Sequence, residues 1–321
     1  MESKEEFWEI FLNELQKKLS PDCSFTRIEV PKINAVHQGI AISIANKDMV
    51  QASAVIYRDQ IYDQWKKSRD WERLFTNLER DIQRAPDTVN MLIETCESYE
   101  NAKNYLQPLV INYENNKSLL GRIPYQREQD LACGLQMIRE GHRMIVSNGI
   151  LEKWGNKTFK TMYEAAVSQA MKKNEPMLFN MASLIAGIET DDNIVGKPRE
   201  NEENIFYVLT NREKSFASFY MLLPEIQEKL YDRFGSFYVL PSSIHETLII
   251  PKKNIHDLYG NVEETQCAET LQEMVMSINR SEVLPQERLS DHIYQYDGKQ
   301  LQCLDKGKVI SFSDRKPQPK L

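Results

Sequence analysis

The chain has 321 residues and a formal net charge of −7, from 40 basic and 47 acidic side chains. A chain of this length predicts about two domains, with a core large enough to fold without disulfides or metal. The acidic balance disfavours broad binding to nucleic acid, because contacts to the phosphate backbone depend on clustered lysine and arginine.

The cysteines and the N-terminus predict a cytoplasmic protein. The five cysteines are scattered, with no CxxC pair, so we expect reduced thiols and neither a zinc motif nor a disulfide framework. The N-terminus is acidic and leads straight into an amphipathic segment, unlike a signal peptide. No uncharged stretch approaches the roughly 20 apolar residues that span a bilayer, so we expect no membrane contact.

Residue periodicity in the first hundred residues predicts helices around one small set of strands. Phe7, Phe11 and Leu15 have helical spacing, and Pro21 ends that helix. A second apolar stripe begins at Trp71, and we expect Pro86 to interrupt it. In chain order, the predicted elements are a helix over 7–19, a strand over 25–30, a hairpin of 35–44 and 50–57, and helices over 71–82 and 89–100.

The middle of the chain repeats the order strand, turn, strand, helix. The predicted elements are strands over 130–138 and 143–147, helices over 150–154 and 158–173, a hairpin of 204–209 and 217–222, and a helix from Pro224 to Gly235. The order therefore starts three times, near residues 35, 130 and 204, which suggests a structural repeat. Hairpins imply antiparallel pairing, so the predicted fold class is α+β.

The last hundred residues predict further strands, one strong helix and a final hairpin. The predicted elements are strands over 237–240 and 246–250, a helix beginning at Asn261 with Glu264 as a capping box, and a hairpin of 291–296 and 301–304 around Asp297-Gly298. We expect an N-terminal domain over 1–86, a larger α+β region over 87–305, and a basic flexible tail over 306–321. The polar run over 190–203 is predicted to be an exposed loop.

Strong catalytic motifs are missing from the sequence. It contains no phosphate loop, no dinucleotide-binding turn, no HExxH pair and no GxSxG elbow. Its five histidines lie far apart, without metal-ligand spacing. We therefore expect no cofactor and no metal, and the sequence carries no established enzyme signature.

One stretch, 240–251, places a serine near a histidine. If it is a strand, Ser243 and His245 point to the same side, as a nucleophile and its base would. Glu246 then faces away, so the carboxylate behind the histidine would have to come from elsewhere, for example from Asp291. The alternative is that Ser243 belongs to a turn and His245 bonds to a neighbouring group.

A second stretch, 289–297, alternates polar and aromatic residues. One face would carry Asp291, and the other His292, Tyr294 and Tyr296. An aromatic face with a histidine would stack on a flat ligand. The alternative is an ordinary half-buried face of a sheet.

Three stretches together carry a resemblance. LPSSIHETLIIP (240–251), LSDHIYQYD (289–297) and LVINYENNKSLLGRIPYQREQDLA (109–132) resemble an uncharacterised bacterial domain-of-unknown-function family of anaerobic gut bacteria. The resemblance covers nearly the whole chain to about residue 297, and residues 298–321 look like an extension. The later hairpin–helix units are similar, more weakly, to a second uncharacterised bacterial family. The resemblance implies a bacterial, cytosolic protein and brings no site residue with it.

Three functions compete at this point. The leading hypothesis is a cytosolic binding or interaction module without catalysis, with an unidentified protein or small molecule as its partner. The alternative is a hydrolase-like enzyme that uses Ser243 and His245, helped by Asp291 or His292. A nucleic-acid-associated factor is the third, and it requires a local basic groove despite the net charge.

Overall fold

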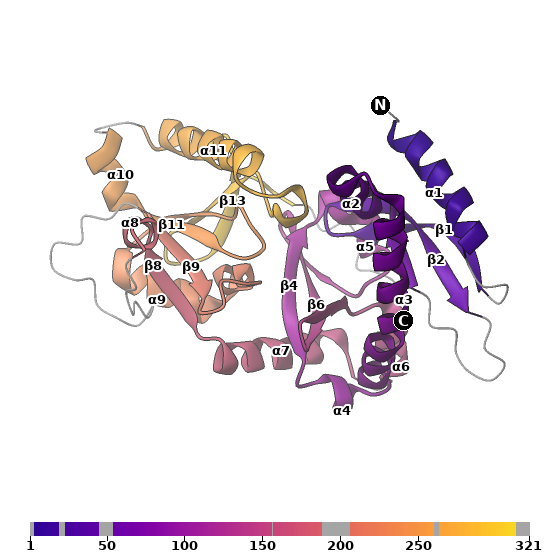
Figure 1. Cartoon of the computed structure of the whole chain (residues 1–321). Coiled ribbons are helices and arrows are strands. Elements are labelled where there is room, and N and C mark those ends of the chain that lie inside the picture. The colour runs from indigo at the N-terminus through magenta and orange to yellow at the C-terminus, as the bar shows by residue number, and fades with distance from the viewer. Residues whose placement is uncertain are drawn as a thin grey trace. The chain divides into compact units, whose positions relative to one another are not determined.

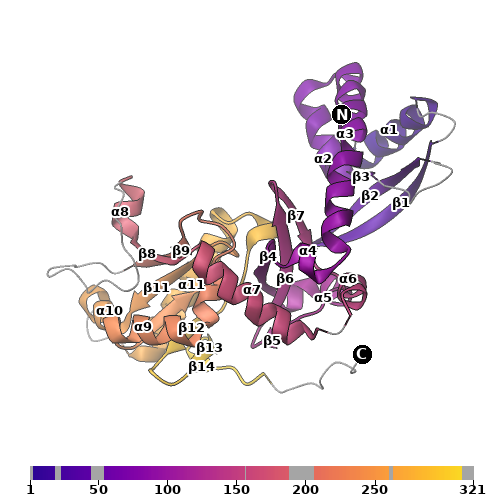
Figure 2. The same cartoon turned by 90° about the horizontal axis from the view of Figure 1, so that it is seen from below.

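The protein is described by a computed structural model, which places residues 3–18, 23–44, 54–155, 157–187, 206–259 and 263–312. The chain divides into two compact units, Met1–Ala102 and Lys103–Leu321 (Figures 1 and 2). Helices and antiparallel sheets occur in both units, which confirms the α+β class. Among the described helices, none is both long enough and apolar enough to cross a bilayer.

Unit 1 is a three-stranded antiparallel sheet with helices packed on one face (Figure 1). Its elements are α1 (Lys4–Lys18), β1 (Cys23–Lys32), β2 (Ala35–Ile44), β3 (Ala54–Tyr57), α2 (Arg58–Ser68), α3 (Trp71–Cys96) and α4 (Tyr99–Ala102). The strand order is β1-β2-β3, so each strand pairs with its neighbour in the chain. The turn expected around 46–48 lies outside the described residues.

The helices of unit 1 meet the sheet in one apolar core. Phe7 and Phe11 of α1 lie one turn apart and are fully buried, as their spacing predicts. They pack with Ile40 of β2 and with Phe75 of α3, whose ring is 5.6 Å from that of Phe11. Because strand residues alternate between faces, the buried Ile40 marks the side of β2 that the helices cover.

Helix α3 differs from the prediction, because it runs without a break from Trp71 to Cys96. The predicted interruption at Pro86 is therefore wrong, and the predicted domain boundary at 86/87 falls inside the helix. A proline removes one backbone hydrogen bond and usually kinks or breaks a helix. Here the first half is fixed by the Asp70 side chain, which accepts from Arg73 N, and by the buried Leu74, while the second half packs against α4.

Unit 2 contains two antiparallel sheets, and its helices alternate with the strands along the chain (Figure 2). Its first part comprises β4 (Leu106–Asn112), the 3-10 helix η1 (Glu114–Asn116), α5 (Lys117–Leu120), β5 (Gln126–Glu128), β6 (Leu131–Arg139), β7 (His142–Ile145), α6 (Asn148–Lys153) and α7 (Phe159–Lys173). In this four-stranded sheet, β6 pairs with β4, β5 and β7, and α7 packs against β4. The predicted hairpin around Glu140-Gly141 is confirmed as β6–β7.

The second part of unit 2 is a seven-stranded sheet with the order β14-β13-β12-β10-β11-β9-β8. Its strands are β8 (Pro176–Asn180), β9 (Tyr207–Asn211), β10 (Phe237–Leu240), β11 (Thr247–Pro251), β12 (Ile293–Tyr296), β13 (Leu301–Asp305) and β14 (Lys308–Val309). Its helices are α8 (Met181–Ile185), η2 (Ser218–Leu222), α9 (Pro224–Phe234), α10 (Lys252–Tyr259), α11 (Glu264–Ser281) and η3 (Pro285–Glu287).

The centre of this sheet is buried on both faces. Every residue of β9, β10 and β11 is buried. Leu271 of α11 packs in the same cluster as Val208 and Ile250. Phe234 of α9 contacts Tyr207, which precedes Val208 on β9 and therefore faces the other side of the sheet. Continuous apolar strands of this kind need cover on both sides, and α11 and α9 provide it.

The third predicted hairpin is wrong, and the three-fold repeat is therefore not confirmed. Residues 217–222 form the 3-10 helix η2, and β9 pairs instead with β8 and β11. The Asn211 side chain binds both the N–H and the carbonyl of Ser215, and Lys214 and Phe216 adopt positive φ. This compact loop turns the chain away from β9, so the segment that directly follows it does not pair with β9.

The C-terminal hairpin matches its prediction and positions the residues that follow. β12 and β13 pair with Tyr294 opposite Cys303, around the predicted Asp297-Gly298 turn. Part of the basic segment after 306 forms β14, while residues 313–321 lie outside the described ranges, as do the 190–203 loop and Asn261 of the predicted capping box.

We predict that Gly39→Ala in β2 destabilises unit 1 by about 1–3 kcal/mol, the usual cost of overpacking a core. A Cβ at Gly39 would lie 2.5 Å from the backbone oxygen of Ile56 on β3, and a backbone oxygen cannot move aside without breaking the sheet. Urea unfolding monitored by tryptophan fluorescence measures this, because Trp8, Trp65 and Trp71 all lie in unit 1.

The control is Gly121→Ala, where the nearest atoms to an added Cβ are 3.7 Å away and φ is −65°. An unchanged midpoint for Gly39→Ala would show that the sheet does not need the close approach of β2 to β3.

Candidate functional site

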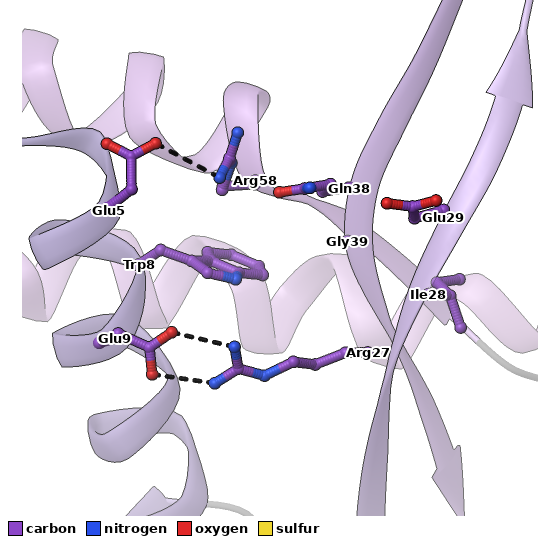
Figure 3. Close-up of a pocket in the computed structure, with 9 residues that line it drawn as sticks. All are labelled: Glu5, Trp8, Glu9, Arg27, Ile28, Glu29, Gln38, Gly39 and Arg58. Carbon is purple, nitrogen blue, oxygen red and sulfur yellow. Dashed lines mark hydrogen bonds and ion pairs between the residues drawn. The ribbon is translucent and has the colours of Figure 1, made fainter.

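Unit 1 contains a cavity of about 330 Å³ between α1 and the first two strands (Figure 3). It lies on the helix-facing side of the sheet, where the inward residues of β1 change from Phe25 through Arg27 to Glu29. On β2 the same face changes from the buried Ile40 to the exposed Gln38. The cavity therefore forms where the core face of the sheet becomes polar.

Two ion pairs flank the buried Trp8 on the helix side of this cavity, as Figure 3 shows. Below the indole ring, both guanidinium nitrogens of Arg27 donate to the Glu9 carboxylate, at 3.0 and 2.9 Å. These hydrogen bonds lower the pKa of Glu9. Above the ring, Arg58 Nη1 lies 3.7 Å from Glu5 Oε1. Both cations that line the cavity are therefore already matched with a carboxylate.

The opposite wall carries a carboxylate without a matching cation. Glu29 lines the cavity from β1, beside Gln38 of β2, and it has no hydrogen bond or ion pair with any residue that the structure describes. With three glutamates against two arginines, the lining has a net negative charge, which favours a cationic guest.

The structure places Ser243 and His245 in a loop before β11 rather than on a strand. Ser243 Oγ accepts a hydrogen bond from the backbone N–H of His245, at 3.0 Å. The His245 ring has other partners: Nδ1 accepts from Phe216 N–H at 3.2 Å, and Nε2 lies 3.7 Å from Glu287 Oε1. Burial lowers the pKa of His245. Among the described contacts, no hydrogen bond joins the hydroxyl to the ring, which a serine nucleophile needs.

Asp291 and His292 point to different partners. Asp291 Oδ1 accepts a hydrogen bond from Asn279 Nδ2 of α11 at 2.7 Å. His292 Nδ1 lies 2.9 Å from Oδ2 of Asp130, which lies in the turn between β5 and β6. None of the described contacts brings either residue to Ser243 or His245.

Asp130 is the centre of a buried polar cluster that also contains Ser290, His292, Tyr294 and Cys303. The residue is only 4% exposed. Ser290 Oγ donates to Oδ2 at 2.6 Å, and the Tyr294 hydroxyl donates to Oδ1. Cys303 Sγ lies 3.8 Å from Oδ1. Because Tyr294 and Cys303 are paired across β12 and β13, the hairpin presents both to the same carboxylate.

The cluster keeps Asp130 ionised despite its burial. Burial alone would raise its pKa, but hydrogen bonds from His292, Ser290 and Tyr294 outweigh that effect, and the pKa of Asp130 is lowered. The hydrogen bond to Asp130 raises the pKa of His292, against the opposing effect of burial. The pair therefore carries opposite charges at mildly acidic pH.

Sequence reasoning singled out His292 and its aromatic neighbours but missed Asp130 and Cys303. It interpreted Asp130 as the first residue of a strand, whereas the residue lies in a turn after Gln129, which has a φ of +58°. Cys303 was detectable, because the predicted hairpin already places it opposite Tyr294. The face with His292 and Tyr294 is a covered sheet face, since Tyr294 is fully buried.

The chain belongs to a family of unknown function, DUF5688, whose model matches residues 4–298. This confirms the resemblance to an uncharacterised family over nearly the whole chain. The match assigns no activity and no site residue. The comparisons with curated proteins and with solved structures returned no match.

We predict that Tyr294→Phe lowers the free energy of unfolding by about 1.5–3 kcal/mol, the usual value of a hydrogen bond to a charged group. The variant keeps the buried ring and removes only the hydroxyl that donates to Asp130. Urea denaturation measures the loss. Tyr296→Phe is the matched control on the same strand, because no hydrogen bond from its hydroxyl is described; equal effects of the two substitutions would contradict the role of Asp130.

The stability of the protein should depend on pH through the His292–Asp130 pair. A raised pKa of His292 gives stability that is fully present below its ordinary value of 6.5 and is lost as pH rises through the raised value. A lowered pKa of Asp130 gives stability that is present above its ordinary value of 3.8 and is lost as pH falls through the lowered one. The pair therefore stabilises most between these two ordinary values.

We expect His292→Gln to cost about 1–3 kcal/mol at pH 6 and progressively less toward pH 9. Urea unfolding of both proteins across this range measures the difference. The control is His142→Gln, which changes an exposed histidine on β7. A difference that grew with pH would reverse the assigned charge of His292.

Proposed function

We propose that this member of the family is a binding protein whose unit 1 holds a small ligand that carries a positive charge. The observation that carries the proposal is Glu29, a carboxylate on the cavity wall without a partner among the described residues. Glu29 is exposed at the cavity wall, so its carboxylate can be reached by a cation that enters from solvent.

The size and walls of the cavity support a small amphipathic guest. A volume of about 330 Å³ is at the lower end for ligand sites. Trp8 offers an aromatic ring beside the charged groups, and an indole is the best aromatic partner for a cation. Arg27 is paired with Glu9 and Arg58 with Glu5, so the positive charge of each arginine is largely neutralised and repels a bound cation less.

The alternatives have less support. The hydrolase hypothesis needs a hydrogen bond between Ser243 and the His245 ring, and the described contacts of both residues go elsewhere. The nucleic-acid hypothesis needs a basic groove, whereas the cavity lining is acidic and the chain carries a net charge of −7. Binding without catalysis, in the cytoplasm of a bacterium, is the reading we propose.

The test compares two probes with the same aromatic body and opposite charge, tryptamine and indole-3-acetate. We expect tryptamine to raise the melting temperature of the full chain and to bind in calorimetry, and indole-3-acetate to do neither. Glu29→Gln should weaken tryptamine binding by about 10-fold or more, because a hydrogen bond to a charged group is worth about 1.5–3 kcal/mol.

The matched control is Glu79→Gln, which removes an exposed carboxylate from α3 that does not line the cavity. It should leave binding unchanged. Preference for indole-3-acetate would assign the cavity to anions through Arg27 or Arg58 and overturn the proposal. Equal binding by wild type and Glu29→Gln would also overturn it.

A further inference from the structure

We propose that Asp130, His292 and Cys303 of unit 2 form a binding site for a divalent transition metal, with Zn²⁺ as the best fit. The carboxylate oxygen, the imidazole nitrogen and the thiol sulfur all lie within 4.8 Å of one another. Asp130 lies 162 positions before His292, whereas Cys303 lies on the hairpin that follows His292, which explains why no ligand spacing is visible in the sequence. This inference is independent of the ligand proposed for unit 1.

The distances between donors suit a small tetrahedral ion. Asp130 Oδ2 lies 2.9 Å from His292 Nδ1, and Asp130 Oδ1 lies 3.8 Å from Cys303 Sγ. Ligand atoms bound to zinc at 2.0–2.3 Å in a tetrahedron are about 3.3–3.7 Å apart. The two distances involve different oxygens of Asp130 and lie on either side of this range, and the ligand atoms of His292 and Cys303 lie within 4.8 Å of each other. Rearrangement of these side chains would bring all three donors to one ion.

The donor chemistry favours zinc among the common divalent cations. One oxygen, one nitrogen and one sulfur ligand suit a borderline-soft ion, whereas Mg²⁺ and Ca²⁺ select oxygen. Three protein ligands leave a fourth position for water or another molecule. The His292 side chain is 32% exposed while Asp130 and Cys303 are buried, so an ion would enter beside the imidazole.

A surrounding set of hydrogen bonds already holds the three ligands in place. Gln129 accepts from the backbone N–H of Cys303 at 2.5 Å and donates to the carbonyl of Leu301 at 2.9 Å, which ties the turn to β13. Ser290 and Tyr294 donate to the carboxylate of Asp130. Partners of this kind orient metal ligands before the ion arrives.

Binding the ion changes the protons of the cluster in a defined way. The Cys303 thiol and the His292 Nδ1 each give up a proton to solvent, and their electron pairs then bind the metal. The ion replaces the positive charge that His292 supplies to Asp130. The network therefore keeps a counter-charge for its buried carboxylate in both states.

The experiment uses the full chain, treated with chelator and then dialysed against Zn²⁺ or Co²⁺. We expect about one ion per chain, a higher melting temperature with Zn²⁺, and the near-ultraviolet absorption of a thiolate bound to Co²⁺. Cys303→Ser should abolish that absorption and weaken Zn²⁺ binding by at least about tenfold, the least that loss of even a supporting residue usually costs.

Cys96→Ser is the control, since Cys96 lies on α3 in unit 1, and it should bind both ions as the wild type does. Circular dichroism shows whether each variant folds, and the Co²⁺ spectrum of the wild type requires no variant. The proposal is overturned if wild type binds no more Zn²⁺ than a metal-free blank, if its Co²⁺ form lacks the thiolate absorption, or if Cys303→Ser binds as tightly.

Discussion

The buried carboxylate of Asp130 is the interaction on which the architecture of unit 2 depends. Removing an ionised carboxylate from water is costly unless hydrogen bonds and a counter-charge compensate for it. Asp130 lies in a turn of the four-stranded sheet, while Ser290, His292 and Tyr294 precede or belong to β12 of the seven-stranded sheet. The charge of Asp130 is compensated only where the two sheets meet, so the need for these partners also determines how the sheets join.

Unit 1 is stabilised in a different way, by apolar contacts between aromatic rings. Phe7 packs against Trp65 and Trp71 at ring distances of 5.0 and 5.3 Å, and Phe11 against Phe75 at 5.6 Å. Such a core needs no polar partner, so polar groups collect at its edge. The cavity forms at this edge, where the fully apolar face of the sheet ends, and the ion pairs of α1 close its side.

Local patterns in the sequence predicted much of the fold, but they could not predict contacts between residues that are far apart in the chain. β2 has the bounds that alternation predicts, and β12 pairs with β13 as in the predicted hairpin, across the loop of residues 297–300 that contains Asp297-Gly298. Prediction failed where tertiary contacts override local signals, at Pro86 within α3 and at η2, which is buried among other elements. The cavity residue Glu29 reads in the sequence as an ordinary exposed position of a strand.

The polar cluster shows most clearly why sequence alone was insufficient. The hydrogen bond between His292 and Asp130 joins residues that are 162 positions apart, so no spacing rule connects them. Periodicity correctly placed His292 and Tyr294 on one face, and hairpin register adds Cys303 to that face. The sequence did not show that Asp130 covers this face of the hairpin, because that contact depends on how the two sheets of unit 2 pack.

A protonated His292 and a bound metal ion are two ways to compensate for the same buried charge. Both place a positive charge beside Asp130, and both use His292 Nδ1, so they exclude each other. Ser290 and Tyr294 can keep their hydrogen bonds to the carboxylate in either state, because each carboxylate oxygen accepts more than one contact. The junction of the sheets therefore does not require the metal for folding. A metal ion would take the place of the proton on His292 Nδ1 as the positive charge beside Asp130, while Ser290 and Tyr294 continue to join the two sheets.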